Sequence, residues 1–370
     1  MKLTVVTHTI HNTHGTTYSA YAPYVKEMNI WFKHFNRVEV VAPLSPCKQP
    51  LTQAYATQIS LIKVPGFQIT GVLEVLKTIV KVPVIIFYLF RAFAHTDHIH
   101  IRCPGNMGLL GCLVQIFFPK KHKTVKYAGN WDPQSKQPVS YRLQKWILNN
   151  VFLTKNTKVL VYGEWPDTSK NIVPFFTATY QEAEKEPLSV RTYRKDLKFA
   201  FVGTLSPGKR PLFAIQLIEE LQKLGYEATL DILGDGVMFE TLRTYITQHE
   251  LHTGIHLHGN LSANKVKQHL KESHFLILPS QSEGWPKAVA EAMFWGAIPI
   301  TSKVSCLPWM LDNGKRGILI ENNLVEAVKK IDSVLKNKDL LPILSDTAAQ
   351  WSRIYTLEYF EEALKKLINT

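Results

Sequence analysis

Short apolar runs that favour strands alternate with helical segments along most of the chain. Residues 2–7 and 37–42 are rich in β-branched side chains, and the segment between them, including 18–35, has a helical pattern. A strand, helix, strand order at this spacing favours parallel pairing through a right-handed crossover. Further strand candidates in this half are 59–64, 98–102, 124–128 and 158–162. The first half therefore predicts one doubly wound domain.

The same alternation restarts after a polar stretch at residues 181–195, which resembles an interdomain linker. Predicted strands follow at 197–203, 228–234, 254–258, 275–279 and 298–302, and predicted helices at 212–224, 236–249, 264–272 and 285–295. A chain of 370 residues is also longer than a usual single domain. We expect an α/β protein of two doubly wound, Rossmann-like domains, residues 1–185 and 186–354, followed by a terminal helix within 355–370.

The cysteines and the N-terminal residues indicate in which cellular compartment the protein works. The four cysteines, Cys47, Cys103, Cys112 and Cys306, form no C-x-x-C pair and show no regular spacing. This favours neither a disulfide framework nor a zinc site, and it fits a reducing cytoplasm. The first residues lack the long apolar stretch of a signal peptide, so we expect a cytoplasmic protein.

Positive charge is concentrated in the first half of the chain. Residues 1–185 hold 21 basic and 9 acidic side chains, whereas residues 186–370 hold 22 and 21. Such one-sided charge predicts an anionic partner, either nucleic acid or an acidic membrane surface, and a merely solvated face is the alternative.

The most hydrophobic run, 72–93, is interrupted by Lys77, Lys81 and Pro83, which argues against a membrane span. It predicts a helix that belongs to the core or lies at a membrane interface.

Two glutamates frame a predicted helix start that directly follows a buried strand. Glu283 precedes the helix, and Glu291 lies two turns into it. The backbone N–H groups at a helix start, including those near 286–288, favour a phosphate or diphosphate. Glu283 is then placed to face sugar hydroxyls and Glu291 to reach a ribose. The alternative is that both glutamates are ordinary helix charges.

Glycine-containing turns follow three other strands of the second half. Gly203 opens a loop that carries Lys209 and Arg210, two cations able to neutralise a diphosphate. Gly234 and Gly259 end the next two strands, at the sheet edge where open α/β folds bind ligands. Neither a G-x-G-x-x-G nor a Walker lysine pattern is present, which argues against dehydrogenases and P-loop enzymes.

Together these motifs resemble, in order, the donor domain of the family 4 retaining glycosyltransferases, which have the GT-B fold of two domains facing across a cleft. The resemblance implies that Glu283 contacts the transferred sugar, Glu291 the ribose, Lys209 the diphosphate, and residues near Gly259 the base. Relatives often carry arginine directly after the first glycine, where this chain has Thr204, so we expect Arg210 to supply the second cation. The predicted donor residues are Gly203, Thr204, Lys209, Arg210, Gly234, Gly259, Asn260, Leu261, Glu283, Gly284, Trp285, Pro286, Lys287, Ala288 and Glu291.

The first half resembles the acceptor domain of the same family, and more particularly that of bacterial surface-polysaccharide transferases. Some relatives carry histidine where this chain has Arg102, so Arg102 is predicted, with Glu283, Lys209 and Arg210, as a catalytic residue. The predicted acceptor residues are Gly15, Arg102, Asn130, Trp131 and Asp132. In this fold the terminal helix crosses back onto the N-terminal domain.

The resemblance implies transfer from a UDP- or GDP-sugar to a glycan or a lipid-diphosphate-linked acceptor in cell-surface polysaccharide synthesis, with retention. The chain has no Asp-x-Asp sequence, and we expect cations and amides to stabilise the diphosphate without a metal or other cofactor. We expect no nucleic-acid partner and an enzyme that is cytoplasmic or peripheral on the membrane's inner face. The alternatives are a GT-B hydrolase or epimerase, and a non-catalytic protein that binds sugar nucleotides or polyanions.

Overall fold

The computed structural model describes residues 1–370 except 16, 46–50, 67–71, 195 and 370. Its contacts divide the chain into two compact units, Met1–Phe175 with Glu361–Thr370, and Phe176–Phe360. The division after Phe175 lies a little before residue 185, where the sequence suggests it. Each unit has its own parallel sheet and its own core.

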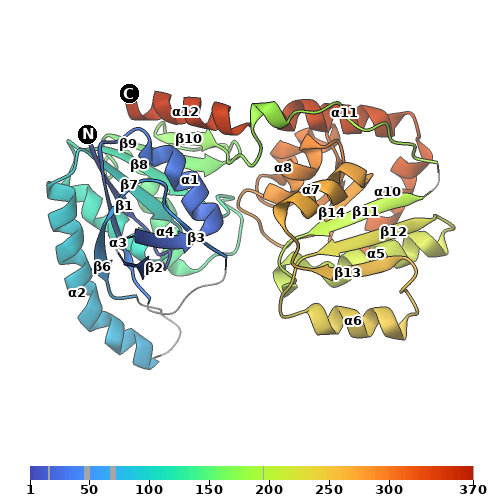
Figure 1. Cartoon of the computed structure of the whole chain (residues 1–370), viewed down its shortest axis with the longest axis horizontal. Coiled ribbons are helices and arrows are strands. Elements are labelled where there is room, and N and C mark those ends of the chain that lie inside the picture. The colour runs from blue at the N-terminus through green and yellow to red at the C-terminus, as the bar shows by residue number, and fades with distance from the viewer. Residues whose placement is uncertain (16, 46–50, 67–71, 195, 370) are drawn as a thin grey trace. The chain divides into compact units, whose positions relative to one another are not determined.

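A seven-stranded parallel sheet forms the centre of the first unit, in the order β10-β9-β8-β7-β1-β4-β6. The strands are β1 (Lys2–Val6), β4 (Arg37–Pro43), β6 (Ser60–Val64), β7 (His98–Cys103), β8 (His122–Tyr127), β9 (Thr157–Tyr162) and β10 (Ile172–Phe175). The apolar runs of the inner strands β1, β4, β7 and β9 are buried, because helices cover a sheet of this kind on both faces, whereas the edge strands β6 and β10 are only partly buried. Figure 1 shows helix α2 (Val72–Ala94) running beside β6.

Helices α1 (Ala22–Phe32), α2, α3 (Asn106–Val114) and α4 (Val139–Leu148) belong to the same unit. Ile85, Leu89 and Phe93 of α2 are buried against the sheet, together with Leu110 of α3 and Ile147 of α4. The terminal helix α12 (Leu357–Asn369) is also tied to this unit, since Glu361 lies 2.9 Å from the amine of Lys33, the residue that follows α1.

An antiparallel sheet that the sequence pattern did not predict precedes α1. Strands β2 (His11–His14) and β3 (Thr17–Tyr21) form a hairpin, and β5 (Thr52–Ala54) pairs with β3. The helix predicted over 18–35 therefore begins later, at Ala22. Thr and Tyr side chains favour the strand, and Pro23, in the first turn of α1, favours a helix start there.

A six-stranded parallel sheet forms the second unit, in the order β13-β12-β11-β14-β15-β16. Its strands are β11 (Leu197–Val202), β12 (Ala228–Leu233), β13 (Ile255–Gly259), β14 (Phe275–Leu278), β15 (Ile298–Ser302) and β16 (Ile318–Ile320). Its helices are α5 (Pro211–Lys223), α6 (Phe239–Gln248), α7 (Ala263–Glu272), α8 (Lys287–Phe294), α9 (Leu307–Met310), α10 (Leu324–Lys336) and α11 (Leu340–Ser352). The predicted strands and helices of this half agree closely with these elements.

In each sheet the chain adds strands first on one side of its first strand and then on the other side, so each sheet has one point where the order of addition reverses. In the first unit the reversal lies between β1 and β7, and in the second it lies between β11 and β14. Ligands of open α/β sheets bind beyond the carboxyl ends of the strands at such a point. Each unit therefore has one favoured ligand-binding edge.

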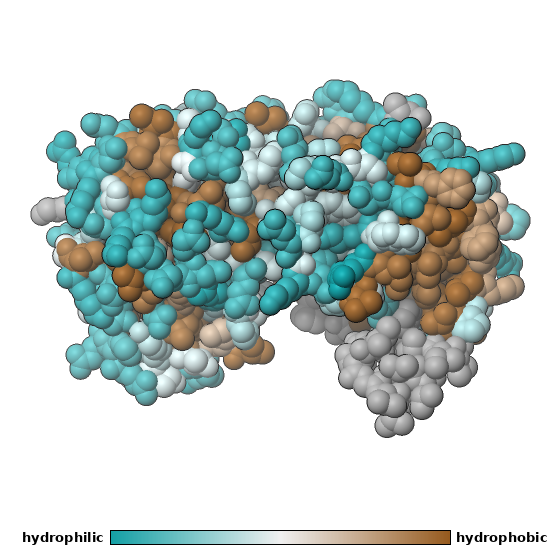
Figure 2. All heavy atoms as spheres, turned by 180° about the vertical axis from the view of Figure 1, so that it is seen from behind, coloured by the Kyte–Doolittle hydropathy of each residue, from teal (hydrophilic) through white to brown (hydrophobic). Residues whose placement is uncertain are grey.

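Helix α2 is apolar on more than one side. Ile85 and Leu89 are buried, whereas Phe87 is 63% exposed and Val84 is 46% exposed. Figure 2 shows hydrophobic side chains gathered on one face of the first unit. Within the described part of the chain, no helix combines the length and apolarity needed to cross a membrane.

Candidate functional site

Three glycine turns meet at the carboxyl edge of the second sheet. Gly203, Gly234 and Gly259 stand at the ends of the neighbouring strands β11, β12 and β13. The amide of Gly234 donates to the carbonyl of Gly259 at 2.8 Å, and that of Gly203 to the carbonyl of Leu233 at 3.0 Å. A Cβ on Gly234, whose φ is 152°, would lie 1.9 Å from the carbonyl oxygen of Gly203. The close approach of these turns requires glycine at 234.

Lys209 and Glu283, distant in sequence, form an ion pair beside these turns. The Lys209 amine lies 2.6 and 2.8 Å from the two carboxylate oxygens of Glu283. The amide of Gln281 donates to the carbonyl of Gly208 at 2.8 Å, so the loops that carry the pair are joined by backbone as well. Glu283 is buried, whereas the Lys209 side chain is 30% exposed. The pair thus joins a fixed carboxylate to a cation that solvent reaches.

Arg210 follows Lys209 with a left-handed backbone, φ 55° and ψ 48°, at the start of α5. Its guanidinium lies 4.2 Å from the ring centre of Phe213 and donates to the side-chain oxygen of Asn322. Burial lowers the pKa of Arg210, which nevertheless remains a cation at neutral pH. Thr204, in the same loop, is exposed.

Helix α8 begins where the motif predicts it, with Pro286 before its first residue, Lys287. The amides of Lys287 and Ala288 lie in the first turn, where N–H groups have no carbonyl partner within the helix. Gly284 accepts a hydrogen bond from the Cys306 thiol at 3.1 Å through its carbonyl. The α8 start is therefore held close to the loop that follows β15.

Trp285 and Glu291 lie in different surroundings. The Trp285 ring is 7% exposed and stacks on that of Trp351 with a centroid distance of 6.2 Å. Only its backbone is then suited to a ligand. Glu291, two turns into α8, accepts a hydrogen bond of 2.8 Å from the Thr179 hydroxyl. Asn260 is exposed and Leu261 half-buried just after β13.

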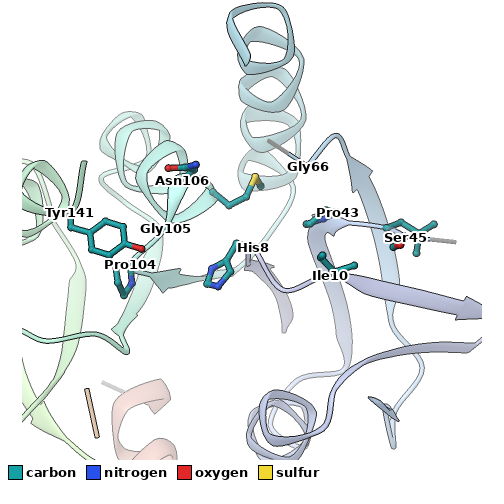
Figure 3. Close-up of a pocket in the computed structure, with 11 residues that line it drawn as sticks. His8, Ile10, Pro43, Ser45, Gly66, Pro104, Gly105, Asn106 and Tyr141 are labelled. Atoms are coloured by element: carbon teal, nitrogen blue, oxygen red, sulfur yellow. The ribbon is translucent and has the colours of Figure 1, made fainter. Parts of the chain in front are cut away.

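A pocket of about 660 Å³ lies at the corresponding edge of the first sheet, at the reversal between β1 and β7 (Figure 3). Its lining follows the carboxyl ends of four strands and includes the start of α3. The lining residues are His8, Ile10, Pro43, Leu44, Ser45, Gly66, Pro104, Gly105, Asn106, Met107 and Tyr141. This is a concave site of the size that takes small ligands.

Hydrogen-bonding groups face this pocket from three segments. Figure 3 shows the hydroxyl end of Tyr141 pointing toward Pro104 and His8. A Cβ on Gly105, φ 147°, would lie 3.1 Å from Nδ1 of His8, so glycine permits the loop to approach the imidazole. Desolvation and the charge of Arg102 lower the pKa of His8, which favours a neutral ring at pH 7. A neutral imidazole can both donate and accept a hydrogen bond.

The predicted acceptor residue Arg102 lies in an ion cluster instead of lining the pocket. Its guanidinium bonds Glu27 of α1, and the amine of Lys126 lies 3.0 Å from the other oxygen of Glu27. Burial alone would raise the pKa of Glu27, but the charges of Arg102 and Lys126 outweigh it and hold the pKa well below its usual range. Arg102 is thus already paired within its own unit.

The other predicted acceptor residues are dispersed. Trp131 is 3% exposed and packs edge-on against Tyr127, so its ring has no free face for a sugar. Asn130 is buried and its side-chain oxygen accepts from the amide of Asp132 at 2.9 Å. Gly15 occupies the exposed turn of the β2–β3 hairpin. None of these three residues, Arg102 or Asp132 is among the described residues that line the pocket.

Sequence reasoning missed His8, Asn106 and Tyr141. His8 directly follows the predicted strand 2–7, and Asn106 lies in the loop after the predicted strand 98–102. The rule that ligands bind beyond strand carboxyl ends could have found both. Tyr141 lies on α4, which no sequence motif connects to this edge.

Among the described residues, the side chains spaced to hold a metal ion are Asp231, His258 and His269, and none is a predicted donor residue.

Comparison with known proteins agrees with this geometry. Residues 182–351 match the family described as Glycosyl transferases group 1. A Salmonella typhimurium protein named as the putative colanic acid biosynthesis glycosyltransferase WcaL is 33% identical over 147 residues, 38% of this chain and 36% of its own. UDP-Gal:alpha-D-GlcNAc-diphosphoundecaprenol alpha-1,3-galactosyltransferase of Escherichia coli is 31% identical over 137 residues, 36% of this chain and 35% of its own. The matched stretch therefore covers little more than a third of each relative.

The whole chain also resembles a solved structure. HepE of Anabaena, solved in complex with UDP and glucose, superposes with a TM-score of 0.67 at 13% identity, over 100% of this chain and 99% of that one. This likeness shows the fold, which is the GT-B arrangement of two Rossmann-like domains. The strand order and the glycine turns agree with the match of residues 182–351 to the glycosyl transferases group 1 family.

Proposed function

We propose that the protein is a retaining glycosyltransferase that moves a sugar from a nucleoside diphosphate to an acceptor hydroxyl. One observation carries the proposal: within the family-matched domain, Lys209 and Glu283 form an ion pair at the sheet edge where the glycine turns converge. A buried carboxylate beside an accessible cation suits a ligand with both hydroxyls and phosphates.

In the proposed donor complex the Lys209 amine turns toward the diphosphate, together with Arg210 and the first amides of α8. Charge-assisted hydrogen bonds of this kind are strong, and a helix start adds a partial positive charge. Glu283 then accepts from sugar hydroxyls and Glu291 from the ribose. The glycine turns at 203, 234 and 259 leave room for the ligand, with Asn260 and Leu261 near the base.

The proposed chemistry is a front-face displacement. The bond from the anomeric carbon to the diphosphate oxygen breaks as the acceptor oxygen attacks from the same face. The acceptor proton passes to the departing diphosphate oxygen, and no protein nucleophile is required. Lys209, Arg210 and the α8 amides stabilise the negative charge that develops on the diphosphate. In metal-dependent enzymes a divalent ion stabilises this charge.

For the acceptor we propose the pocket that contains His8, Asn106 and Tyr141, because its groups can hydrogen-bond sugar hydroxyls. The names of the two relatives support a surface polysaccharide or a lipid-diphosphate-linked glycan as acceptor class. The Anabaena protein was solved with UDP, and the E. coli relative is named for a UDP-linked galactose donor, so both favour a UDP-sugar over a GDP-sugar.

We further propose that the protein works at the cytoplasmic face of a membrane that holds such an acceptor. The basic first half and the exposed apolar side chains Phe87 and Phe117, 63% and 69% exposed, support contact with acidic lipid.

The test is a screen of UDP- and GDP-sugars by thermal shift, followed by product analysis with the donor that binds. A bound donor at a hundred times its Kd stabilises the folded state by about 2.7 kcal/mol. Release of free nucleotide that depends on added acceptor, with an α-linked product from an α-linked donor, is the expected result. Release that needs no acceptor would identify a hydrolase or epimerase instead, and no binding of any sugar nucleotide would end the proposal.

A further inference from the structure

Three side chains that commonly bind metals converge in the second unit, outside the proposed donor residues. Asp231 lies on β12, His258 near the end of β13, and His269 on α7. Nε2 of His258 is 2.6 Å from one carboxylate oxygen of Asp231, and Nδ1 of His269 is 3.4 Å from the other. One ligand atom from each residue lies within 4.8 Å of the other two.

The spacing and the chemistry fit one divalent transition metal. Zinc binds imidazole nitrogen and carboxylate oxygen at about 2.0–2.2 Å in tetrahedral geometry, which brings ligand atoms about 3.3 Å apart. Nε2 of His258 lies 2.6 Å from one Asp231 oxygen and Nδ1 of His269 lies 3.4 Å from the other, and one ligand atom of each residue lies within 4.8 Å of the other two, so side-chain rotations would bring all three to that spacing. Two imidazoles and one carboxylate are also a donor set that suits zinc and its neighbours better than magnesium or calcium.

Access and backbone placement support the same assignment. The three side chains are 27% to 31% exposed, so an ion can enter from solvent. They come from two adjacent strands and a helix, and α7 packs against β11 of the same sheet. An ion held by all three would join α7 to the strand ends near Gly259.

We propose that Asp231, His258 and His269 form a site for a divalent ion of the zinc class, with water completing the coordination. The site ties α7 to β12 and β13 and takes no part in the chemistry proposed above. Proton competition for the imidazoles makes metal affinity fall as the solution becomes acidic. The alternative is a purely hydrogen-bonded cluster in which the carboxylate accepts from both rings.

The test is a calorimetric titration of the chelator-treated 370-residue chain with zinc chloride, repeated with cobalt chloride while visible absorption is recorded. We expect one ion per chain, a cobalt band of a four- or five-coordinate site, and a zinc-dependent rise in Tm. His258→Ala and His269→Ala should each weaken zinc binding by about tenfold or more, and Asp231→Asn should weaken it too.

The matched control is His256→Ala, because His256 is exposed, lies on the same strand and has a ring centroid 6.3 Å from that of His258. It should leave zinc binding unchanged. Metal-free Tm and circular dichroism establish that each variant folds. No zinc binding by the wild type, or binding that the His258 and His269 variants retain, would overturn the proposal, whether or not the chain transfers sugar.

Discussion

At the scale of single residues, the Lys209 and Glu283 pair is the feature with most chemical consequence. Each side chain neutralises the other, at 2.6 Å. A ligand that offers both hydroxyls and a diphosphate can replace each half of this pair with a matching partner. The pair therefore keeps a buried carboxylate satisfied before a donor arrives.

The first prediction concerns the two framing glutamates. Glu283→Gln and Glu291→Gln should each lower kcat/KM by more than about tenfold, because each removes a charged acceptor from a donor hydroxyl. Steady-state kinetics with a saturating acceptor measure this. Glu240→Gln is the control, since its side chain is 69% exposed on α6, and it should keep wild-type kinetics. A folded double variant with unchanged kinetics would refute the assignment.

The second prediction concerns Glu27, whose side chain is 10% exposed between Arg102 and Lys126. Glu27→Gln should lower the free energy of unfolding at pH 7 by about 3–5 kcal/mol, because it leaves two buried cations without a counter-charge. The pKa of Glu27 is lowered from an ordinary value of 4.5, so its contribution is present above that pH and is lost as pH falls below it.

Urea denaturation at pH 7 and at pH 4 measures the effect, and the gap between variant and wild type should narrow at the lower pH. Glu321→Gln, which breaks an exposed pair with Lys303, serves as control and should change little. A gap that is equal at both pH values would show that the Glu27 charge is not what stabilises the cluster.

Residue roles were less predictable from sequence than residue positions. The predicted strand 98–102 correctly places Arg102 near a strand end, but it does not reveal that Glu27 on α1 pairs with it. Likewise, Trp131 is among the predicted acceptor residues, whereas its ring is buried and packs on Tyr127. The Arg102 pair depends on a partner 75 residues away in sequence, and the burial of Trp131 depends on tertiary packing that no local pattern records.

At the scale of elements, α2 and the short helix η1 (Gln115–Phe117) present apolar side chains to solvent. Phe90 of α2 lies 5.3 Å, centroid to centroid, from Phe117 of η1, so the two elements form one surface. The sequence leaves open whether the helix predicted at 72–93 belongs to the core or lies at a membrane interface, and these two alternatives do not exclude each other. One side of the helix is core, and another is exposed and apolar.

The third prediction follows for membrane binding. Phe87→Gln with Phe117→Gln should reduce cosedimentation with acidic vesicles several-fold, because both rings are exposed and would enter the lipid interface. Reversing the exposed charge of Lys120 should weaken binding further, and more so at low salt. Turnover of a soluble acceptor analogue should remain largely intact.

Val237→Gln is the control for this experiment, since Val237 is 84% exposed in the other unit. Lys123, which is close to Lys120 in the sequence, is unsuitable for charge reversal. It is 2% exposed, and its amine donates to the carbonyl of Phe118 at 2.7 Å. Equal binding to neutral and acidic vesicles would remove the electrostatic case for an acidic membrane.

Regular parallel strands were the elements that sequence predicted best. Each of the five strands predicted in the second half overlaps an observed one. Inner strands such as β14 and β15 are continuous apolar runs that are fully buried, and the edge strand β13 alternates apolar residues with exposed histidines. The β2-β3-β5 sheet was missed because its strands are short and polar. In particular, β2 is His-Asn-Thr-His, a composition that resembles a loop.

At the scale of the whole molecule, the fourth prediction concerns divalent ions. Transfer should survive EDTA, because Lys209, Arg210 and the α8 amides are proposed to carry the charge that a metal stabilises in other enzymes. Initial rates before and after chelation, at a temperature well below Tm, measure this. The temperature matters because loss of zinc from the site proposed at Asp231 would lower Tm. Loss of activity that magnesium or manganese restores, but zinc does not, would contradict the prediction.

The two-sheet architecture could be predicted from sequence because strand and helix patterns repeat in both halves. The motifs of the second half could also be placed at strand ends, because they occur in a fixed order, and their donor roles stay predictions. The pocket of the first unit could not be predicted, because it is assembled from the ends of several strands and from α4, with no local motif. The order of strands in the sheet decides which strand ends lie next to one another, and no single segment of the sequence determines that order.

The contact between Gly234 and Gly203 limits how this protein can change. A single methyl group at Gly234 would meet the carbonyl oxygen of Gly203 at 1.9 Å, whereas a Cβ at Gly203 or Gly259 would meet nothing within 4 Å. Position 234 therefore accepts only glycine. We expect substitutions that alter ligand choice to fall on exposed or half-buried neighbours such as Asn260 and Leu261, and not at Gly234.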